Sequence, residues 1–222
     1  MSLWLMITSV RRLEIPFLET DDVQQIDKLN HLMDGLQATT IDCNPWPAYQ
    51  ATVKANFLMA HSGEAILLKY VISEKYIAAN EVTNGNIHND SCVELFIAFD
   101  EEGYYNLEFN CLGFTKIGYG NGRDNRKLLP VDVIKQLSFS SKINANSVIN
   151  KNGGFDWEIM LVIPRAIFTE HKITSFHNLN AKGNFYKCGD GLPQPHFLTW
   201  SMIKADQPDF HRKEFFGELI FS

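Results

Sequence analysis

Two glutamates, Glu94 and Glu108, are the side chains of this sequence best placed for acid–base chemistry or for hydrogen bonding to a ligand. Each lies in a segment of alternating polar and apolar residues, 90–99 and 104–111, and the turn 100–103 joins these segments into a predicted β-hairpin. Both carboxylates come to one face of the hairpin, because side chains alternate along a strand. Glycosidases hold two carboxyl groups about 5–5.5 Å apart to retain, or about 6.5–9.5 Å apart to invert, the anomeric configuration. A glycoside hydrolase using this pair is therefore one hypothesis.

The same face of the hairpin is rich in amide and carboxylate groups. It carries Tyr104, Asn106 and Asn110 beside the two glutamates, and no Lys or Arg. Sugars are recognised by planar donors and acceptors combined with aromatic rings. The pattern predicts either a saccharide-binding face or an ordinary solvated sheet surface, and alternation by itself favours the solvated surface.

A long aromatic loop is predicted near the C-terminus, between strands at 181–188 and 216–221. Long loops in compact domains are usually functional or disordered, and a high aromatic content argues against disorder. We expect this loop to pack over one end or one face of the sheets. The side chains expected to rim the polar face, from this loop and from one earlier position, are His88, Trp200, Phe210, His211 and Arg212.

Other catalytic and metal motifs find little support. The 7 histidines are scattered without HExxH or HxH spacing, and there is no GxSxG, P-loop or GxGxxG motif. The glycine-rich segment 118–122 is explained by a tight loop, and the acidic run 100–102 by a solvated turn rather than a calcium site. The 4 cysteines form no CxxC pair, so buried free thiols are favoured over disulfides.

The composition excludes some partners. The 222 residues include 20 Lys and Arg against 26 Asp and Glu, a formal net charge of −6. This acidic balance argues against binding to nucleic acid or to an anionic membrane, and no apolar stretch is long enough to span a bilayer. The apolar run 3–7 precedes Arg11 and Arg12, whereas a signal peptide carries its positive charge first, so we interpret this run as a first strand or a leader.

The predicted elements indicate an all-β, antiparallel sandwich, jelly-roll-like, with one or two short helices, in a single domain over 1–222. Apolar spacing predicts a helix over 23–36, capped by Thr20 or Asp21, within an N-terminal extension of strand and helix, 1–44. Trp157 alternates with apolar residues and is predicted to be core. Trp46, between two prolines, is predicted to plug the sandwich end or to form a sugar platform, and the plug is favoured. The strands are predicted at 52–60, 65–73, 90–99, 104–111, 114–119, 137–143, 155–163, 181–188 and 216–221.

Several blocks together resemble one family. The segments 90–96 and 104–110, Trp157 leading into Ile163-Pro164, and the closing Phe216-Gly217 resemble the family 9 carbohydrate-binding modules, over 45–222. The resemblance is strongest to the family 9-like branch of polysaccharide-degrading bacteria. It implies a β-sandwich, often attached to xylanases, that binds glycans without cleaving them, with calcium ions that stiffen loops. It also implies a periplasmic or extracellular location.

The family's site residues map onto part of this chain. Characterised members clamp a terminal sugar between two tryptophans and bind it with a Glu, an Arg and an Asn. The Glu corresponds to Glu94 and the Asn to Asn110, whereas Glu108 stands at about the position of the Arg. The position of the first tryptophan falls near His88, where this chain has no Trp, and Trp200 or Phe210 would supply the second ring.

The resulting prediction is a non-catalytic module that binds plant or host polysaccharide fragments of the xylan or cellulose type and supports their degradation. Its predicted ligand-binding residues include Glu94, Asn106, Glu108 and Asn110 on the sheet face. The alternative is the hydrolase that uses Glu94 and Glu108. Distant relatives of the sandwich hold haem through Met and His, but the spacing of Met59, Met160 and Met202 gives that hypothesis no support. Nothing in the sequence indicates an oligomeric state.

Overall fold

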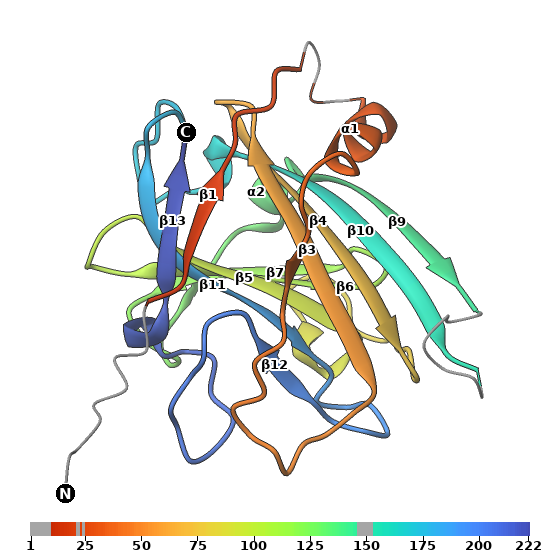
Figure 1. Cartoon of the computed structure of the whole chain (residues 1–222). Coiled ribbons are helices and arrows are strands. Elements are labelled where there is room, and N and C mark those ends of the chain that lie inside the picture. Colours follow the sequence, from red (N-terminus) through yellow and green to blue (C-terminus); the bar gives the residue numbers. More distant parts are fainter. Residues whose placement is uncertain (1–9, 21–22, 24, 146–152) are drawn as a thin grey trace, which may run out of the picture.

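Two β-sheets packed face to face make up the protein (Figure 1). The computed structural model describes residues 10–20, 23, 25–145 and 153–222. The larger sheet has the order β1 (Arg12–Ile15), β13 (Gly217–Phe221), β11 (Asn180–Cys188), β5 (Cys92–Ala98), β6 (Tyr104–Asn110), β7 (Thr115–Gly120) and β8 (Lys127–Leu128), with β12 (Phe197–Thr199) paired to β11. The smaller sheet has the order β2 (Thr39–Thr40), β3 (Val53–His61), β4 (Ala65–Glu74), β10 (Phe155–Pro164) and β9 (Ser138–Asn144).

The predicted β-sandwich is confirmed, and all but one of these strand pairings are antiparallel. The exception is β1, which runs parallel to β13. The short strands β1, β2, β8 and β12 were not predicted, because segments of two to four residues are too short to show an alternating pattern. The apolar run 3–7, which we interpreted as a strand or a leader, lies outside the described residues.

The main core lies between the two sheets. Val93, Leu95 and Ile97 of β5 are fully buried there, as their alternation predicts. The rings of Phe57 and Phe185 stack across the sheets with centroids 3.8 Å apart. Trp157 is 2% exposed, which confirms it as a core residue.

Among the described residues, two short helices and three 3-10 turns accompany the sheets. The helix α1 (Ile26–Met33) buries Leu29 and Met33 on the outer face of the smaller sheet. It is shorter than predicted and begins after Gln25, without a side-chain cap; the cap predicted at Thr20 is therefore wrong, and Asp21 lies outside the described residues. The other helical elements are α2 (Val131–Ile134), η1 (Ile87–Asn89), η2 (Arg165–Ile167) and η3 (Lys213–Phe215).

The outer face of the larger sheet is covered rather than solvated. Phe96, Tyr104 and Tyr186 on this face are buried beneath Ile203 and Phe216 of the C-terminal loop. The expectation that this loop packs over a sheet face is therefore confirmed, and the expectation of a solvated face is wrong. Alternation could not show this cover, because the covering residues come from a loop that is distant in sequence.

Trp46 closes one end of this covered face. It is 4% exposed, and its indole Nε1 donates to the carbonyl of Ala205 at 2.8 Å. Its ring packs edge-on against Phe197 and tilted against Phe210. It therefore holds the C-terminal loop in place, as a plug and not as an open sugar platform.

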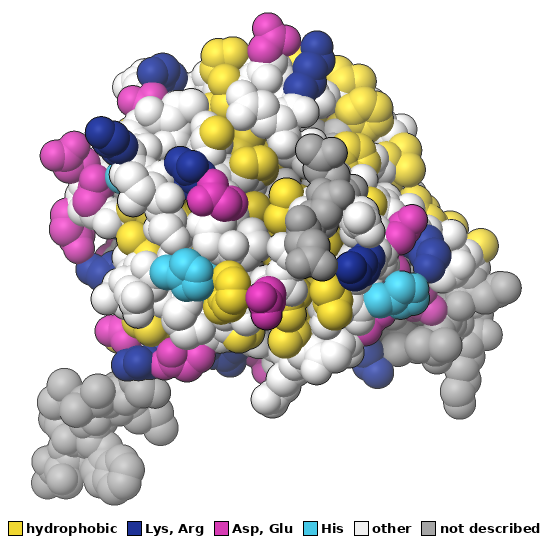
Figure 2. All heavy atoms as spheres, turned by 90° about the horizontal axis from the view of Figure 1, so that it is seen from above, with side chains coloured by type: hydrophobic (Ala, Val, Ile, Leu, Met, Phe, Trp, Pro, Cys, Tyr) yellow, Lys and Arg dark blue, Asp and Glu magenta, His cyan; other side chains and the backbone are white. Residues whose placement is uncertain are grey.

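The surface carries mixed charge. On the face that bears α1, basic and acidic side chains are intermingled and no basic patch gathers (Figure 2). Within the described part of the chain, no helix is long and apolar enough to cross a membrane. All four cysteines are free, and three of them are buried, as predicted.

Candidate functional site

The floor of the site is a pair of buried glutamates on the outer face of the larger sheet. Glu94 of β5 and Glu108 of β6 lie directly opposite each other in the strand register, and they are 3% and 5% exposed. Asn106, two residues along β6, donates from Nδ2 to Oε1 of Glu108 at 2.8 Å. The other oxygen of Glu108 is buried without a hydrogen-bond partner within the protein, and Nδ1 of His88 lies 3.6 Å from it.

Burial and charge repulsion shift the proton equilibrium of this floor. Burial, reinforced by the Glu108 carboxylate, raises the pKa of Glu94 well above its usual range. The oxygen Oε1 of Glu94 accepts from the thiol of Cys188 at 3.2 Å. The floor therefore offers both hydrogen-bond acceptors and a carboxyl group that can hold a proton.

Arg126 supplies the cation that the sequence did not place in the site. It lies directly before β8, and its Nε donates to Oδ1 of Asn106 at 2.8 Å. Its two terminal nitrogens bond to four backbone carbonyls, the closest being those of Gly122 and Tyr104, each at 2.7 Å. The guanidinium also lies over the Tyr104 ring, 4.3 Å from its centroid. These contacts fix its position and leave the polar floor ordered before a ligand arrives.

Glycines make room for Arg126. Gly118 and Gly120 belong to β7, so interpreting 118–122 as a loop was wrong for its first three residues. A Cβ at Gly118 would lie 2.9 Å from Oδ1 of Asn106 and 3.4 Å from Nε of Arg126. Alternate glycines in the strand followed by an arginine were thus the signal in the sequence that could have located this residue.

Replacing Arg126 with Lys is expected to lower the free energy of unfolding by about 1–3 kcal/mol, since one ammonium cannot replace five guanidinium hydrogen bonds. Thermal and urea unfolding would measure the loss. Arg123→Lys is the matched control, because Arg123 also lines the site but is exposed. Equal stability of the two variants would contradict the anchoring role of Arg126.

Two histidines at the rim of the cavity have pKa values shifted in opposite directions. Nδ1 of His88, on η1, lies 3.6 Å from Oε2 of Glu108, and this carboxylate raises the pKa of His88. His211 lies 2.8 Å from the Tyr104 hydroxyl through Nδ1, and burial, reinforced by the charge of Arg126, lowers the pKa of His211 to about 3. At neutral pH His211 is therefore uncharged, whereas His88 gains protons more readily than an ordinary histidine.

Glu108→Gln is expected to lower the pKa of His88 toward its ordinary value, since the charge that favours the imidazolium is removed. Because the shift is upward, its contribution to stability is present below the ordinary pKa and is lost as the pH rises through the shifted one. NMR titration of the imidazole would measure this change, with Glu102→Gln, at the exposed turn of the same hairpin, as control. An unchanged titration of His88 in Glu108→Gln would contradict the pairing.

Aromatic rings form one wall of the site. The ring of Phe210 stacks on that of Tyr186, with centroids 4.1 Å apart, and it also contacts Phe197 and Trp46. Both Phe210 and Phe197 are half-buried and line the cavity. Their exposed edges give the site an apolar surface beside its polar floor.

Together these groups enclose a cavity of about 430 Å³, which is within the range of small-molecule sites. The structure brings to it six residues that the sequence analysis selected: His88, Glu94, Asn106, Glu108, Phe210 and His211. Residues in the lining that the sequence analysis missed include Phe96, Lys116, Arg123, Arg126, Asp190 and Phe197.

Three predicted residues do not line the cavity. Trp200 is 2% exposed and packs in the main core against Phe185, so its assignment to the rim was wrong. Asn110 is fully buried; it bonds to Asp90 and accepts two backbone N–H groups of the turn after β6, which makes it a structural residue. Arg212 pairs with Glu214 outside the cavity.

The carboxylates of Asp100 and Glu101, in the acidic turn after β5, do not fit a calcium ion. Asp100 accepts from the backbone N–H groups of Glu102 and Gly103, and its other oxygen lies 2.9 Å from Nε2 of His171. Glu101 pairs with Lys182 at 2.7 Å. These oxygens already face donors of the protein and do not converge on a common point.

The haem hypothesis is not supported by the positions of the methionines. Met59 lies in the main core, Met160 lies in the separate cluster beneath α1, and Met202 is exposed. None of them lines the cavity.

A β-sandwich with a polar, aromatic-walled pocket on one sheet face has the architecture of a carbohydrate-binding module. Over residues 27–221 the chain matches the model of carbohydrate-binding family 9. A candidate carbohydrate-binding protein of Bacteroides uniformis is 33% identical, with coverage of 96% of this chain and 100% of that one and a TM-score of 0.88. The chain therefore belongs to carbohydrate-binding family 9.

More distant structures share the fold. A family 9 module from Caldicellulosiruptor kristjanssonii, solved with glucose, is 10% identical, with a TM-score of 0.57 and coverage of 96% of both chains. A family 9 module from the same organism, solved with cellotriose, is also 10% identical, with a TM-score of 0.56 and coverage of 95% of this chain and 93% of that one. No curated protein matches the chain.

Proposed function

We propose that the cavity on the larger sheet binds a saccharide and that the chain acts as a non-catalytic module for plant or host polysaccharide fragments of the xylan or cellulose type. The observation that carries this proposal is the buried floor of Glu94, Glu108 and Asn106, held by Arg126 beside the edge of Phe210. We further propose that it forms one domain and serves polysaccharide degradation outside the cytoplasm.

The donors and acceptors of the cavity suit sugar hydroxyls. The Glu108 carboxyl lines the cavity as an acceptor for a hydroxyl, and Lys116 borders it as a donor, whereas the five N–H groups of Arg126 are all bonded within the protein. Carboxylate and ammonium groups make the strong, charge-assisted hydrogen bonds that hold sugar hydroxyls in one orientation. The edge of Phe210 provides apolar contact for a C–H face of the sugar ring. Family relatives solved with glucose and cellotriose support this ligand class.

The arrangement of the carboxylates favours binding over hydrolysis. A glycosidase places its two carboxyl groups on either side of the scissile bond. Glu94 and Glu108 instead rise from the same face of one sheet, directly opposite each other in register, where Cβ atoms are about 4.5–5.5 Å apart. They meet one side of a ligand as a single acceptor surface, so the hydrolase hypothesis is the weaker one.

A glycan array tests the proposal, with the purified protein applied in buffer, with added calcium and with chelator. Binding to xylan-, cellulose- or gluco-oligosaccharides that is lost in Glu108→Ala but kept in the control Glu102→Ala would support it. A blank array with folded protein would overturn it. Incubation of the same glycans with the protein provides the second arm, since release of sugar that disappears in Glu94→Gln would establish the hydrolase instead.

A further inference from the structure

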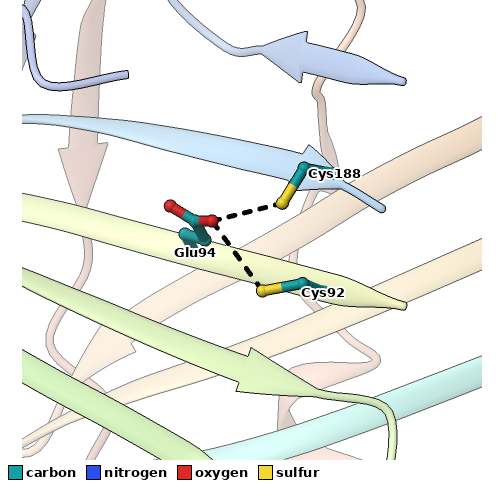
Figure 3. Close-up of side chains that lie close together, drawn as sticks. All are labelled: Cys92, Glu94 and Cys188. Carbon is teal, nitrogen blue, oxygen red and sulfur yellow. Dashed lines mark hydrogen bonds between the residues drawn. The ribbon is translucent and has the colours of Figure 1, made fainter. Parts of the chain in front are cut away.

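Two thiols and a carboxylate converge in the floor of the cavity. Cys92 of β5 and Cys188 of β11 lie directly opposite each other in the strand register, on the same outer face as Glu94. Figure 3 shows both sulfur atoms directed at one oxygen of Glu94. All three residues are at most 3% exposed, and Glu94 and Cys188 line the cavity. In the described part of the chain, this is the one group of three or more such side chains close enough to share an ion.

The distances match those of a coordination shell. Oε1 of Glu94 lies 3.2 Å from Sγ of Cys188 and 3.8 Å from Sγ of Cys92. Sulfur and oxygen ligands on one tetrahedral zinc ion are separated by about 3.5 Å, given Zn–S and Zn–O bonds of about 2.3 and 2.0 Å. All three ligand atoms lie within 4.8 Å of one another. The two oxygen–sulfur distances thus each differ from the value expected around one zinc ion by about 0.3 Å.

We propose that Cys92, Cys188 and Glu94 form a zinc site in the floor of the cavity, with the remaining coordination position open to the cavity. Two thiolates favour a thiophilic ion over calcium or magnesium, and the carboxylate is an established zinc ligand. A site with three protein ligands and an open position is the arrangement that lets zinc contact a further molecule.

Proton release accompanies binding. Burial raises the pKa of Cys92 to about 12 and that of Cys188 well above its usual range, so both thiols are protonated without metal. On binding, the two S–H bonds break and two Zn–S bonds form, and the thiol protons, together with the carboxyl proton where Glu94 carries one, pass to the buffer without transfer of electrons.

The zinc site does not depend on the saccharide proposal. Glu94 is common to both, but the thiols are needed only for the metal and Glu108 only for the sugar. The metal and sugar experiments can thus fail separately. If the protein binds zinc but no glycan, the metal proposal stands and the saccharide proposal is overturned.

The test is titration of the fully reduced, chelator-treated protein with cobalt(II) and then zinc. We expect one cobalt per chain, with the near-ultraviolet charge-transfer absorbance of thiolate coordination, and its displacement by zinc. Cys188→Ala and Cys92→Ala should each weaken zinc binding at least about a hundredfold, beyond the effect of an outer-shell group. Cys111→Ala is the matched control, since Cys111 is equally buried but lies in the main core.

Zinc-edge X-ray absorption of the wild-type protein gives a readout that does not depend on the folding of any variant. Two sulfur neighbours at about 2.3 Å would support the site. A shell of only nitrogen and oxygen, binding retained by a folded Cys188→Ala, or no binding by the reduced wild type would each overturn it.

Discussion

Glu94→Gln is expected to abolish saccharide binding and, at the same time, to raise the melting temperature of the protein. The folded protein holds Glu94 almost fully buried beside Glu108, and burial raises its pKa above the unfolded value of about 4.3. Between these two pKa values the folded state binds a proton that the unfolded state has released. Stability therefore falls as the pH rises through this window, and the loss persists above it.

A glutamine at position 94 cannot ionise, so the variant avoids this loss of stability while keeping the shape of the side chain. At neutral pH we expect the melting temperature to rise by about 2–4 °C, the shift that 1 kcal/mol produces in a domain of this size. The increase should disappear near pH 4, where the carboxyl is protonated in both states. Calorimetry at several pH values measures it, with the exposed Glu102→Gln as control. A lower melting temperature at neutral pH would show that the Glu94 charge stabilises the fold.

Lys187→Met is expected to lower the free energy of unfolding by about 3–5 kcal/mol. Nζ of Lys187 lies 2.9 Å from Oε2 of Glu74, and both side chains are at most 1% exposed. Glu74 also accepts from the indole of Trp157 at 2.7 Å, and Lys187 lies 3.0 Å from Nε2 of His196. Burial and the charge of Lys187 lower the pKa of His196 to about 3, so His196 is neutral and accepts this bond. Removing the Lys187 ammonium leaves the Glu74 carboxylate buried in the core without an opposite charge.

The variant Lys187→Met/Glu74→Gln separates the two parts of this cost. The glutamine that replaces Glu74 can keep a carbonyl oxygen for Trp157 without a buried charge, so we expect the double variant to be more stable than Lys187→Met alone. Urea unfolding measures each variant, with Lys182→Met as control, because this change breaks only the exposed pair with Glu101 and is expected to leave stability nearly unchanged. Additive losses in the double variant would contradict the coupling.

The fold was largely predictable because its long strands carry a local signal. Runs of apolar and β-branched residues, with alternation of period two in β5 and β6, located β3, β4, β5, β6, β10 and β11 to within a residue or two at each end. It also assigned Glu94 and Glu108 to one face, which the register confirms. The short strands gave no such signal, since their pairing depends on neighbours that are distant in sequence.

The site was less predictable because its cover and its cation come from loops. Trp200 looked like a rim residue by type, but the chain turns inward after β12 and buries it against Phe185. Arg126 follows a glycine-rich segment and is brought to Asn106 by hydrogen bonds to carbonyls, a contact that residue type and spacing do not encode. Phe210 lines the cavity, but the sequence could select it only as one of several aromatic residues in the same loop.

The covered outer face of the larger sheet has a consequence for folding. The cavity joins β5 and β6 to Arg126 and to Phe210, so its walls come together only through contacts between segments far apart in the chain. Closing such long loops is costly in entropy, and folds dominated by non-local pairing form in milliseconds to seconds. We therefore expect the pocket to be completed late, when the C-terminal loop docks. Ligand binding would therefore detect formation of the native state and not the earlier collapse of the two sheets.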